Sequence, residues 1–283
     1  MKKVLVIVVT YNGMKWLERC LSSVAGEADV YVWDNDSTDG SADFVAAHYP
    51  QVKLVRSADN LGFAKPNNMG MQYALDHNYD FVYLLNQDAW LEPGVLEKLV
   101  SAAEAHPEFG LLSPLQMTDG CQQLDKQFAK YYSVSWRCVS PPEPVSVRFV
   151  MAAHWLVPVS VIRRIGLFNE ELFPLWGQDD DWCNRLDFYG LKIGVIPEAC
   201  AVHDRAYRKE EKETMVRRNY YTGSLVRLAD CRRPLWERFS FVILFTLVKA
   251  VKYGSVLPFT YFGQIVRLLP QIKKHRENVR TRT

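Results

Sequence analysis

The sequence lacks the patterns that mark several common classes of protein. Its six cysteines form no Cys-x-x-Cys pair and no spacing typical of a zinc site. No Gly-x-Gly-x-x-Gly motif follows the first apolar run, which argues against a dinucleotide-dependent oxidoreductase. Internal repeats and low-complexity segments are also missing. The 283 residues are 48% hydrophobic and 23% charged, a composition typical of an ordered globular protein.

Long apolar runs are equally scarce. Residues 4–9 follow two lysines, but no small-residue cleavage site comes after them, so they indicate a buried strand rather than a signal peptide. Residues 239–248 are apolar on all sides, yet ten residues cannot span about 30 Å of hydrocarbon. We therefore expect a chain of the reducing cytoplasm with free thiols.

Positive charge is concentrated at the C-terminal end. Residues 1–204 contain 16 Lys+Arg and 26 Asp+Glu, whereas residues 205–283 contain 18 and 6. Such a basic segment indicates a polyanionic partner, either an anionic lipid surface or nucleic acid. Because apolar aromatic stretches alternate with Lys and Arg there, we favour a membrane surface, bound through residues 239–283, over nucleic acid. A helix packed on the rest of the protein, or a homodimer interface, is the alternative.

Strand and helix patterns alternate through the first 110 residues. Apolar runs at 4–9, 30–33, 52–55 and 81–85 predict strands, and helical spacing at 14–25, 41–48 and 67–77 predicts helices between them. This alternation predicts βαβ units in a doubly wound α/β domain. Residues 111–150 predict a loop-rich insertion with edge strands. Beyond it we expect helices at 159–166, 178–190 and 209–231, and a strand at 191–196.

Polar clusters follow three of the predicted strands. They are Thr10-Tyr11-Asn12, Asp34-Asn35-Asp36-Ser37 and Asn86-Gln87-Asp88. In open parallel sheets, ligands bind beyond the carboxyl ends of the strands. The second cluster can accept hydrogen bonds from a ribose or a base, or can simply cap the next helix. Asp88 can hold Mg²⁺ or Mn²⁺, to which a diphosphate would add further oxygen ligands.

Three other features carry side chains suited to chemistry. The loop at 60–70 combines glycines with asparagines, and a helix beginning near Asn67 would offer N–H groups to an anion. Residues 179–181 are three consecutive aspartates at a predicted helix start. They either complement the helix dipole or raise one another's pKa, as a general base requires. His203 follows an apolar strand and is either a metal or phosphate contact or a structural histidine.

In this order, the motifs resemble those of the inverting family 2 glycosyltransferases of the GT-A fold, over about residues 4–220. The resemblance is greatest to bacterial rhamnosyltransferase-like members. It rests on residues 9–12, 34–40, 60–63, 67–70, 85–88 and 178–181. It implies an α/β GT-A fold, with a doubly wound, mixed but mainly parallel, Rossmann-like sheet. It also implies a donor half at 1–110 and an acceptor half at 111–233. Residues 234–283 then form a basic, amphipathic, helical extension at the membrane interface.

The resemblance also implies roles for individual residues. The donor site comprises Thr10, Tyr11, Asn12, Asp34, Asp36, Asn60, Gly62, Phe63, Asn68, Asn86 and Gln87. Asp88 and His203 hold Mg²⁺ or Mn²⁺, Asp179 is the catalytic base, and Trp176, Gln178 and Asp180 lie on the acceptor side. Apart from the resemblance, we expect a basic side chain such as Arg205 or Arg208 to hold the diphosphate when a loop closes. Two positions depart from the family pattern. Asn86 replaces the first acid of the metal motif, and Gln178 replaces the usual Glu, which leaves Asp180 and Asp181 as competing bases.

The implied reaction is transfer of a sugar from a dTDP- or UDP-sugar, with dTDP-rhamnose among the candidates. The acceptor is a glycan or a lipid-linked glycan at the inner face of the bacterial plasma membrane. Two other functions are kept as alternatives. One is a non-catalytic carbohydrate or sugar-nucleotide binding protein, which would not need the acids at 88 and 179–181. The other is a sugar-nucleotide pyrophosphorylase, whose Gly-rich loop is not matched by residues 10–14.

Overall fold

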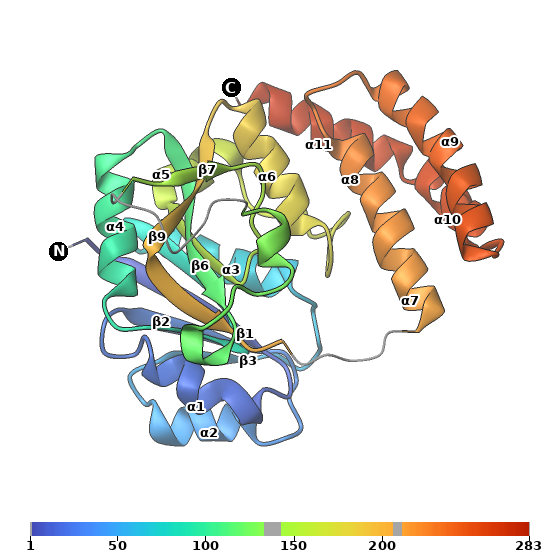
Figure 1. Cartoon of the computed structure of the whole chain (residues 1–283). Coiled ribbons are helices and arrows are strands. Elements are labelled where there is room, and N and C mark those ends of the chain that lie inside the picture. The colour runs from blue at the N-terminus through green and yellow to red at the C-terminus, as the bar shows by residue number, and fades with distance from the viewer. Residues whose placement is uncertain (1, 133–142, 206–210, 283) are drawn as a thin grey trace. The chain divides into compact units, whose positions relative to one another are not determined.

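The computed structural model of the chain describes residues 2–132, 143–205 and 211–282. The chain forms two compact units (Figure 1). Unit 1 is Met1–Leu167 with Leu191–Arg205, and unit 2 is Phe168–Gly190 with Ala206–Thr283. The donor half (1–110), acceptor half (111–233) and extension (234–283) expected from the sequence are functional divisions. These compact units do not test them, so they stay predictions.

Unit 1 is built on a nine-stranded sheet with the order β3-β2-β1-β4-β8-β6-β9-β5, and β7 pairs with β9. The strands are β1 (Val4–Thr10), β2 (Asp29–Asp34), β3 (Lys53–Arg56), β4 (Phe81–Asn86), β5 (Ala89–Leu91), β6 (Phe109–Met117), β7 (Val145–Val147), β8 (His154–Pro158) and β9 (Lys192–His203). β1 to β4 run parallel, β8 is antiparallel to β4, and β6 is parallel to β9. This confirms the mixed, mainly parallel sheet expected from the sequence.

Both faces of this sheet are covered, as the continuous apolar run of β1 predicts. Val6 and Val8 belong to one buried cluster with residues of α1 (Met14–Ser22), α2 (Ser41–His48) and α4 (Val95–Ala105). Ile7, between them, points to the other face, where it meets Gly70 of α3 (Ala64–Asp76). α5 (Val159–Ile165) packs on α3. Short 3₁₀ turns at Asp119–Cys121 and Phe128–Lys130 complete the unit.

The expectation of a loop-rich segment with edge strands at 111–150 was wrong for its first part. β6 is an interior strand between β8 and β9, and every one of its residues is buried. Ser113, Pro114 and Gln116 interrupt its apolar pattern, which hides the strand from a periodicity argument. The pairing register shifts after Pro114, so the proline is accommodated at an irregularity. β7 does lie at the margin, and residues 133–142 fall outside the described residues.

β9 is twice as long as the sequence pattern suggested. We expected it to end at residue 196, but it continues through Pro197 to His203. The register shift that opposes Pro114 and Leu115 also skips residues 197–199, so the strand resumes pairing at Cys200. This continuation brings His203 level with Ala89 of β5.

Unit 2 is helical. It contains α6 (Gln178–Phe188), α7 (Lys212–Val216), a π-helical segment (Arg217–Thr222), α8 (Gly223–Ala229), α9 (Leu235–Tyr253), α10 (Leu257–Arg267) and α11 (Leu269–Thr281). Its core joins Phe173 to Tyr220, Leu228, Val242 and Ile265. The expected basic helix at 209–231 is thus found over 212–229, and residues 206–210 lie outside the described range.

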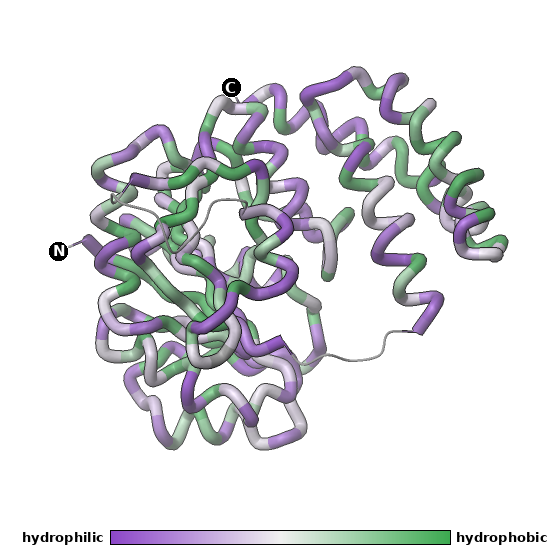
Figure 2. The backbone as a smooth tube through the Cα atoms, in the orientation of Figure 1, coloured by the Kyte–Doolittle hydropathy of each residue, from purple (hydrophilic) through white to green (hydrophobic). Residues whose placement is uncertain are grey.

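α9 exposes much of its apolar surface, and Figure 2 shows its hydrophobic colouring. Only Val242 and Thr246 of this helix are buried. The exposed fractions are 72% for Trp236, 61% for Leu244, 51% for Leu247, 53% for Val248 and 84% for Val251. Among the residues that the structure describes, no helix is both long enough and apolar enough to cross a bilayer.

Replacing Gly70 with Ala should destabilise the protein. The added Cβ would lie 2.7 to 2.9 Å from three side-chain atoms of Ile7, so β1 or α3 must move. We expect a loss of about 1–3 kcal/mol in the free energy of unfolding, measured by urea denaturation. Gly263→Ala in α10 is the matched control, because its Cβ meets no atom within 4 Å. Equal stability of the two variants would contradict this packing.

Candidate active site

The carboxyl ends of β1, β2 and β4 lie side by side. Thr10 pairs with Asp34 in the register of β1 and β2, and Val9 pairs with Asn86 in that of β1 and β4. The polar clusters that follow these strands therefore lie at one edge of the sheet, as the sequence predicted. Thr10 and Asp34 are buried, and Asn86 is half-buried.

Gln87 ties the end of β4 to the turn after β1. Its Oε1 accepts hydrogen bonds from Thr10 Oγ1 at 2.9 Å and from the Tyr11 amide at 2.8 Å. A Cβ at Gly13 would collide with Thr10 Oγ1 and with the Gln87 side chain, so only glycine fits there. Thr10 and Gln87 thus shape the loop, while Tyr11 is 48% exposed and has a ring surface available to a ligand.

Asp34 carries a buried acceptor at this edge. One carboxylate oxygen accepts from the Ser37 amide at 3.0 Å, and the other is buried without a partner among the described residues. Buried polar atoms normally have partners, so the second oxygen suits a donor group from a ligand. Asn12 and Asp36 both have positive φ, at 49° and 65°, and they form tight turns beside it.

Asn35 is a residue whose role the sequence argument missed. It is 2% exposed and joins β2 to the loop at 60–63. Its Oδ1 accepts from Trp33 Nε1 and from the Leu61 amide, both at 3.1 Å, and its Nδ2 donates to the Gly62 carbonyl at 2.7 Å. From the sequence we predict only that Asn35 belongs to the polar cluster at 34–37, because nothing in the sequence shows which loop an asparagine will bind.

The loop at 60–63 is held in a defined turn. Asn60 Oδ1 accepts from the Gly62 amide at 3.0 Å, and Gly62 has a φ of 78°. α3 begins at Ala64, three residues earlier than expected, because Asn67 donates back to the Phe63 carbonyl at 2.9 Å. Asn68, expected in the donor site, is 7% exposed on the second turn of this helix.

Asp88 and His203 lie close together, although they come from different parts of the chain. Asp88 lies in the turn between β4 and β5, and His203 is the last residue of β9. The distance between Asp88 Oδ1 and His203 Nε2 is 3.5 Å, with side-chain exposures of 24% and 5%. The Asp204 amide donates to the Asp88 carbonyl at 2.8 Å, which holds the two segments in register. His203 Nδ1 is buried without a partner among the described residues. The pair that the sequence predicted for a metal therefore does converge.

These two side chains fit a divalent cation only if the substrate supplies more ligands. No group of three or more His, Cys, Asp or Glu side chains suited to a metal occurs in the part of the chain that the structure describes. A carboxylate and an imidazole leave most of an octahedral shell open, and Mg²⁺ commonly fills it with phosphate oxygens and water.

A second histidine, His154 of β8, has its ring next to that of His203 in the Asp88–His203 pair. His154 Nδ1 lies 2.9 Å from Tyr83 Oη, and its Nε2 lies 2.9 Å from the Val202 carbonyl. A carbonyl cannot donate, so we assign the ring proton to Nε2. Burial and nearby His203 lower the pKa of His154 to about 3. His154 is thus a neutral structural residue that fixes the strand leading to His203.

The arginine expected to hold a diphosphate is already engaged. Arg205 Nε lies 3.2 Å from Asp125 Oδ2, and its guanidinium also contacts the sulfur of Met151. Arg208, the other candidate, lies outside the described residues. A phosphate role for Arg205 requires this pair to open.

In unit 2, the three aspartates occupy the first turn of α6. Gly177 precedes them with a φ of 88°, and a Cβ there would lie 2.6 Å from Thr222 of the π-helical segment. Asp179 Oδ1 accepts from the Asp180 amide at 3.0 Å. Gln178 is buried, and its Oε1 has no partner among the described residues. Trp176 is half-buried just ahead of this turn.

Asp181 differs from its neighbours because it is buried in an ionic network. Arg185 Nε donates to its Oδ2 at 2.9 Å, and His275 Nε2 donates to its Oδ1 at 2.9 Å. Asn169 Oδ1 accepts from the Leu172 amide, so its Nδ2 faces His275 Nδ1 at 2.9 Å. We therefore assign the neutral Nε2–H tautomer to His275. Asp181 serves to anchor α6 to α11.

The hydrogen-bonded network around Asp181 and the repulsion between the three carboxylates shift the pKa values of Asp181 and Asp180 in opposite directions. Burial alone would raise the pKa of Asp181, but Arg185 and His275 outweigh it and hold that pKa below its ordinary value. Removal from water and the carboxylates of Asp179 and Asp181 raise the pKa of Asp180 to about 7. The raised pKa that the sequence predicted thus falls on Asp180.

The sequence is similar to those of known glycosyltransferases. Residues 5–130 match the model of glycosyl transferase family 2. The chain is 26% identical over 264 residues to an N-acetylglucosaminyl-diphospho-decaprenol L-rhamnosyltransferase of Mycobacterium tuberculosis, covering 82% of this chain and 86% of that protein. It is 22% identical over 208 residues to the dTDP-rhamnosyl transferase RfbF of Shigella flexneri, covering 70% of this chain and 67% of that one.

Solved structures show the same fold. The crystal structure of S. aureus TarS 1–349 with UDP superposes with a TM-score of 0.54 at 19% identity, covering 85% of this chain and 69% of that one. GalNAc-T7 with UDP, GalNAc and Mn²⁺ superposes with a TM-score of 0.60 at 14% identity, covering 99% and 55%. The fold is the GT-A fold. Residues 5–130 thus carry the family 2 glycosyltransferase match that the motifs predicted, and the chain is a glycosyltransferase that uses a nucleotide-sugar donor.

Replacing Asp181 with Asn should destabilise the protein in a pH-dependent way. Arg185 would lose its carboxylate inside the core, which costs about 3–5 kcal/mol at pH 7. Because folding lowers the pKa of Asp181, its stabilisation is complete above about pH 4 and is lost as the pH falls through the folded-state value. Urea denaturation should show the gap to wild type narrowing below pH 4. Asp59→Asn, on an exposed residue, is the control. A gap that does not change with pH would contradict the network.

Proposed function

We propose that this glycosyltransferase binds a nucleoside diphosphate sugar at the carboxyl ends of β1, β2 and β4. The observation that carries the proposal is the convergence of Asp34, with its unpartnered buried oxygen, and the Asp88–His203 pair on one sheet edge. A nucleoside needs acceptors for its base and ribose, and a diphosphate needs a cation. Tyr11, Asn12, Asp36, Asn60, Gly62, Phe63, Asn68 and Asn86 are proposed to line the rest of the donor site.

For the substrates, we propose a deoxysugar donor such as dTDP-rhamnose and a lipid-linked glycan acceptor. This rests on the activities of the relatives in M. tuberculosis and S. flexneri, at 26% and 22% identity. Transfer would proceed with inversion in one displacement. We also propose that the reaction takes place in the cytoplasm, at the inner face of the plasma membrane, where a lipid-linked acceptor would meet a nucleotide-sugar donor.

The metal role follows from the chemistry of the donor. Mg²⁺ or Mn²⁺, when bound, would neutralise charge on the departing diphosphate. Asp88 and His203 would hold it from the protein side, and His154, through the Val202 carbonyl, fixes the strand that carries His203. Gln87 and Thr10 keep the neighbouring turn in place for the nucleoside.

The base is proposed to be Asp179, which matches the family motif, and Trp176, Gln178 and Asp180 are proposed to face the acceptor. Asp181 is a poor base because both its oxygens are hydrogen-bonded and its pKa is lowered. Asp180 remains a competitor, since a carboxyl with a pKa of about 7 suits proton transfer at neutral pH.

The C-terminal helices are proposed to rest on a membrane. Leu244, Leu247, Val248 and Val251 follow the three- and four-residue spacing of one helix face, and all four are more than half exposed. Exposed apolar side chains beside Lys and Arg suit a helix lying in the headgroup region. A second copy of the chain covering this face is the alternative occupant, and a size measurement would reveal it.

Asp179→Asn should lower kcat about 10²–10⁴-fold with the donor Kd unchanged, because only proton removal from the acceptor is lost. The matched variant Asp180→Asn should keep kcat within about tenfold, and any step near pH 7 should disappear from its pH profile, because the carboxyl with a pKa of about 7 is gone. Steady-state rates from pH 5 to 9 and donor titrations would measure both. The opposite order of losses would transfer the base role to Asp180.

A further inference from the structure

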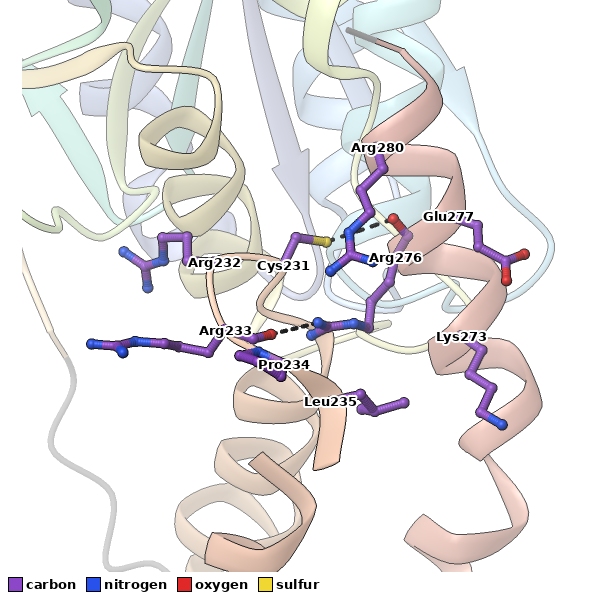
Figure 3. A pocket seen from close by; sticks show the side chains of 9 residues that line it. All are labelled: Cys231, Arg232, Arg233, Pro234, Leu235, Lys273, Arg276, Glu277 and Arg280. Atoms are coloured by element: carbon purple, nitrogen blue, oxygen red, sulfur yellow. Dashed lines mark hydrogen bonds between the residues drawn. The ribbon is translucent and has the colours of Figure 1, made fainter. Parts of the chain in front are cut away.

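A basic hollow of about 450 Å³ lies between the start of α9 and the face of α11 (Figure 3). Its lining is formed by Cys231, Arg232, Arg233, Pro234, Leu235, Lys273, Arg276, Glu277 and Arg280. Five of these side chains are cationic and one is acidic. The hollow belongs wholly to unit 2, and none of these residues takes part in the reaction proposed above.

The wall of this hollow is fixed by a buried arginine. Arg276 is 4% exposed and donates to the carbonyls of Leu228 at 2.9 Å and Arg233 at 2.6 Å, and also to that of Asp230. These bonds hold the α8–α9 connection against α11, as Figure 3 shows for Arg233. The backbone around the hollow is therefore formed in advance, whereas the Arg233 and Lys273 side chains extend from opposite sides of it in Figure 3 and would turn inward to meet a ligand.

The other cations differ in what they already bind. Arg232 is committed to the carboxylates of Asp230 and Asp187 and to Asn184. Arg233 and Lys273 are exposed, and neither forms an ion pair with any described residue. Two such charges at a preformed hollow are suited to an anion with several oxygens, such as a terminal phosphate.

The exposed apolar face of α9 begins next to this hollow. Leu235 lines it, and Trp236, which is 72% exposed, follows immediately. A nucleic acid would satisfy the positive charge but would leave this apolar surface in water. A lipid satisfies both, because its phosphate lies at the level where an interfacial helix begins to bury its apolar side chains.

We propose that this hollow binds the terminal phosphate of a lipid headgroup, a phosphomonoester or a diphosphate, through Arg233 and Lys273. The proposal rests on the membrane contact proposed for α9. It predicts selectivity for an accessible terminal phosphate over a phosphodiester of equal surface charge, which a diffuse basic surface would not show.

Vesicle co-sedimentation of the full chain tests this. Phosphatidylcholine vesicles would contain phosphatidic acid or, at matched zeta potential, phosphatidylglycerol. We expect wild type to bind the phosphatidic acid vesicles about tenfold more tightly. The hollow variant Arg233→Gln/Lys273→Gln should lose this preference. The charge-matched control Lys252→Gln/Arg267→Gln, on exposed residues outside the hollow, should keep it while binding both vesicles more weakly.

Other outcomes separate the two proposals. The face variant Leu244→Asn/Val251→Asn should weaken binding to both vesicles equally, and if it has no effect, the α9 contact fails. If the hollow variant and the control variant lose the preference for phosphatidic acid equally, the phosphate site in the hollow is overturned, whereas the α9 membrane contact is not. Inorganic pyrophosphate is the soluble probe. If it protects wild type but not the hollow variant against thermal unfolding, while no vesicle preference exists, the site takes free phosphate and the lipid proposal is overturned.

Discussion

The donor site depends on the register of β1 between β2 and β4. Thr10 opposite Asp34, and Val9 opposite Asn86, bring three loops to one edge of the sheet. A slip of one residue in any of these pairings would turn every side chain of that strand to the other face. Apolar burial on both faces prevents such a slip, because Val6 and Val8 face one helical layer while Ile7 meets Gly70 in the other.

The acid cluster depends on a different interaction, the buried contact of Asp181 with Arg185 and His275. It fixes α6 by a residue of α11, some 90 positions along the chain. This contact has an electrical effect as well as a mechanical one. Because Asp181 stays ionised, its charge adds to that of Asp179 in raising the pKa of Asp180. The C-terminal helices thereby take part in shaping the acid cluster, and they also carry the exposed face of α9 and the basic hollow beside it.

Much of the fold and part of the site were predictable from local sequence. Continuous apolar runs predicted β1, β2 and β4. The family motifs identified Asp34, Asp88 and His203. The structure places Asp34 at the expected edge of the sheet and brings Asp88 and His203 together as a pair. β6 was missed because Pro114 and Gln116 break its pattern, and the length of β9 was missed because Pro197 normally ends a strand. Asn35 and His275 were missed because their partners are distant in sequence, and only the folded chain shows which ones they bind.

The most direct test of the donor site is a thermal-shift panel of UDP, dTDP, GDP and CMP, each with and without Mn²⁺, on wild type and Asp88→Asn. A ligand that binds only the folded protein raises its melting temperature, by roughly 5 °C at a hundred times its Kd. A donor site whose metal is held by Asp88 should give a Mn²⁺-dependent rise with a diphosphate of uridine or thymidine in wild type, and should lose the Mn²⁺ dependence in Asp88→Asn. No rise with any nucleotide on folded wild type, or the same Mn²⁺-dependent rise in the variant, would contradict it.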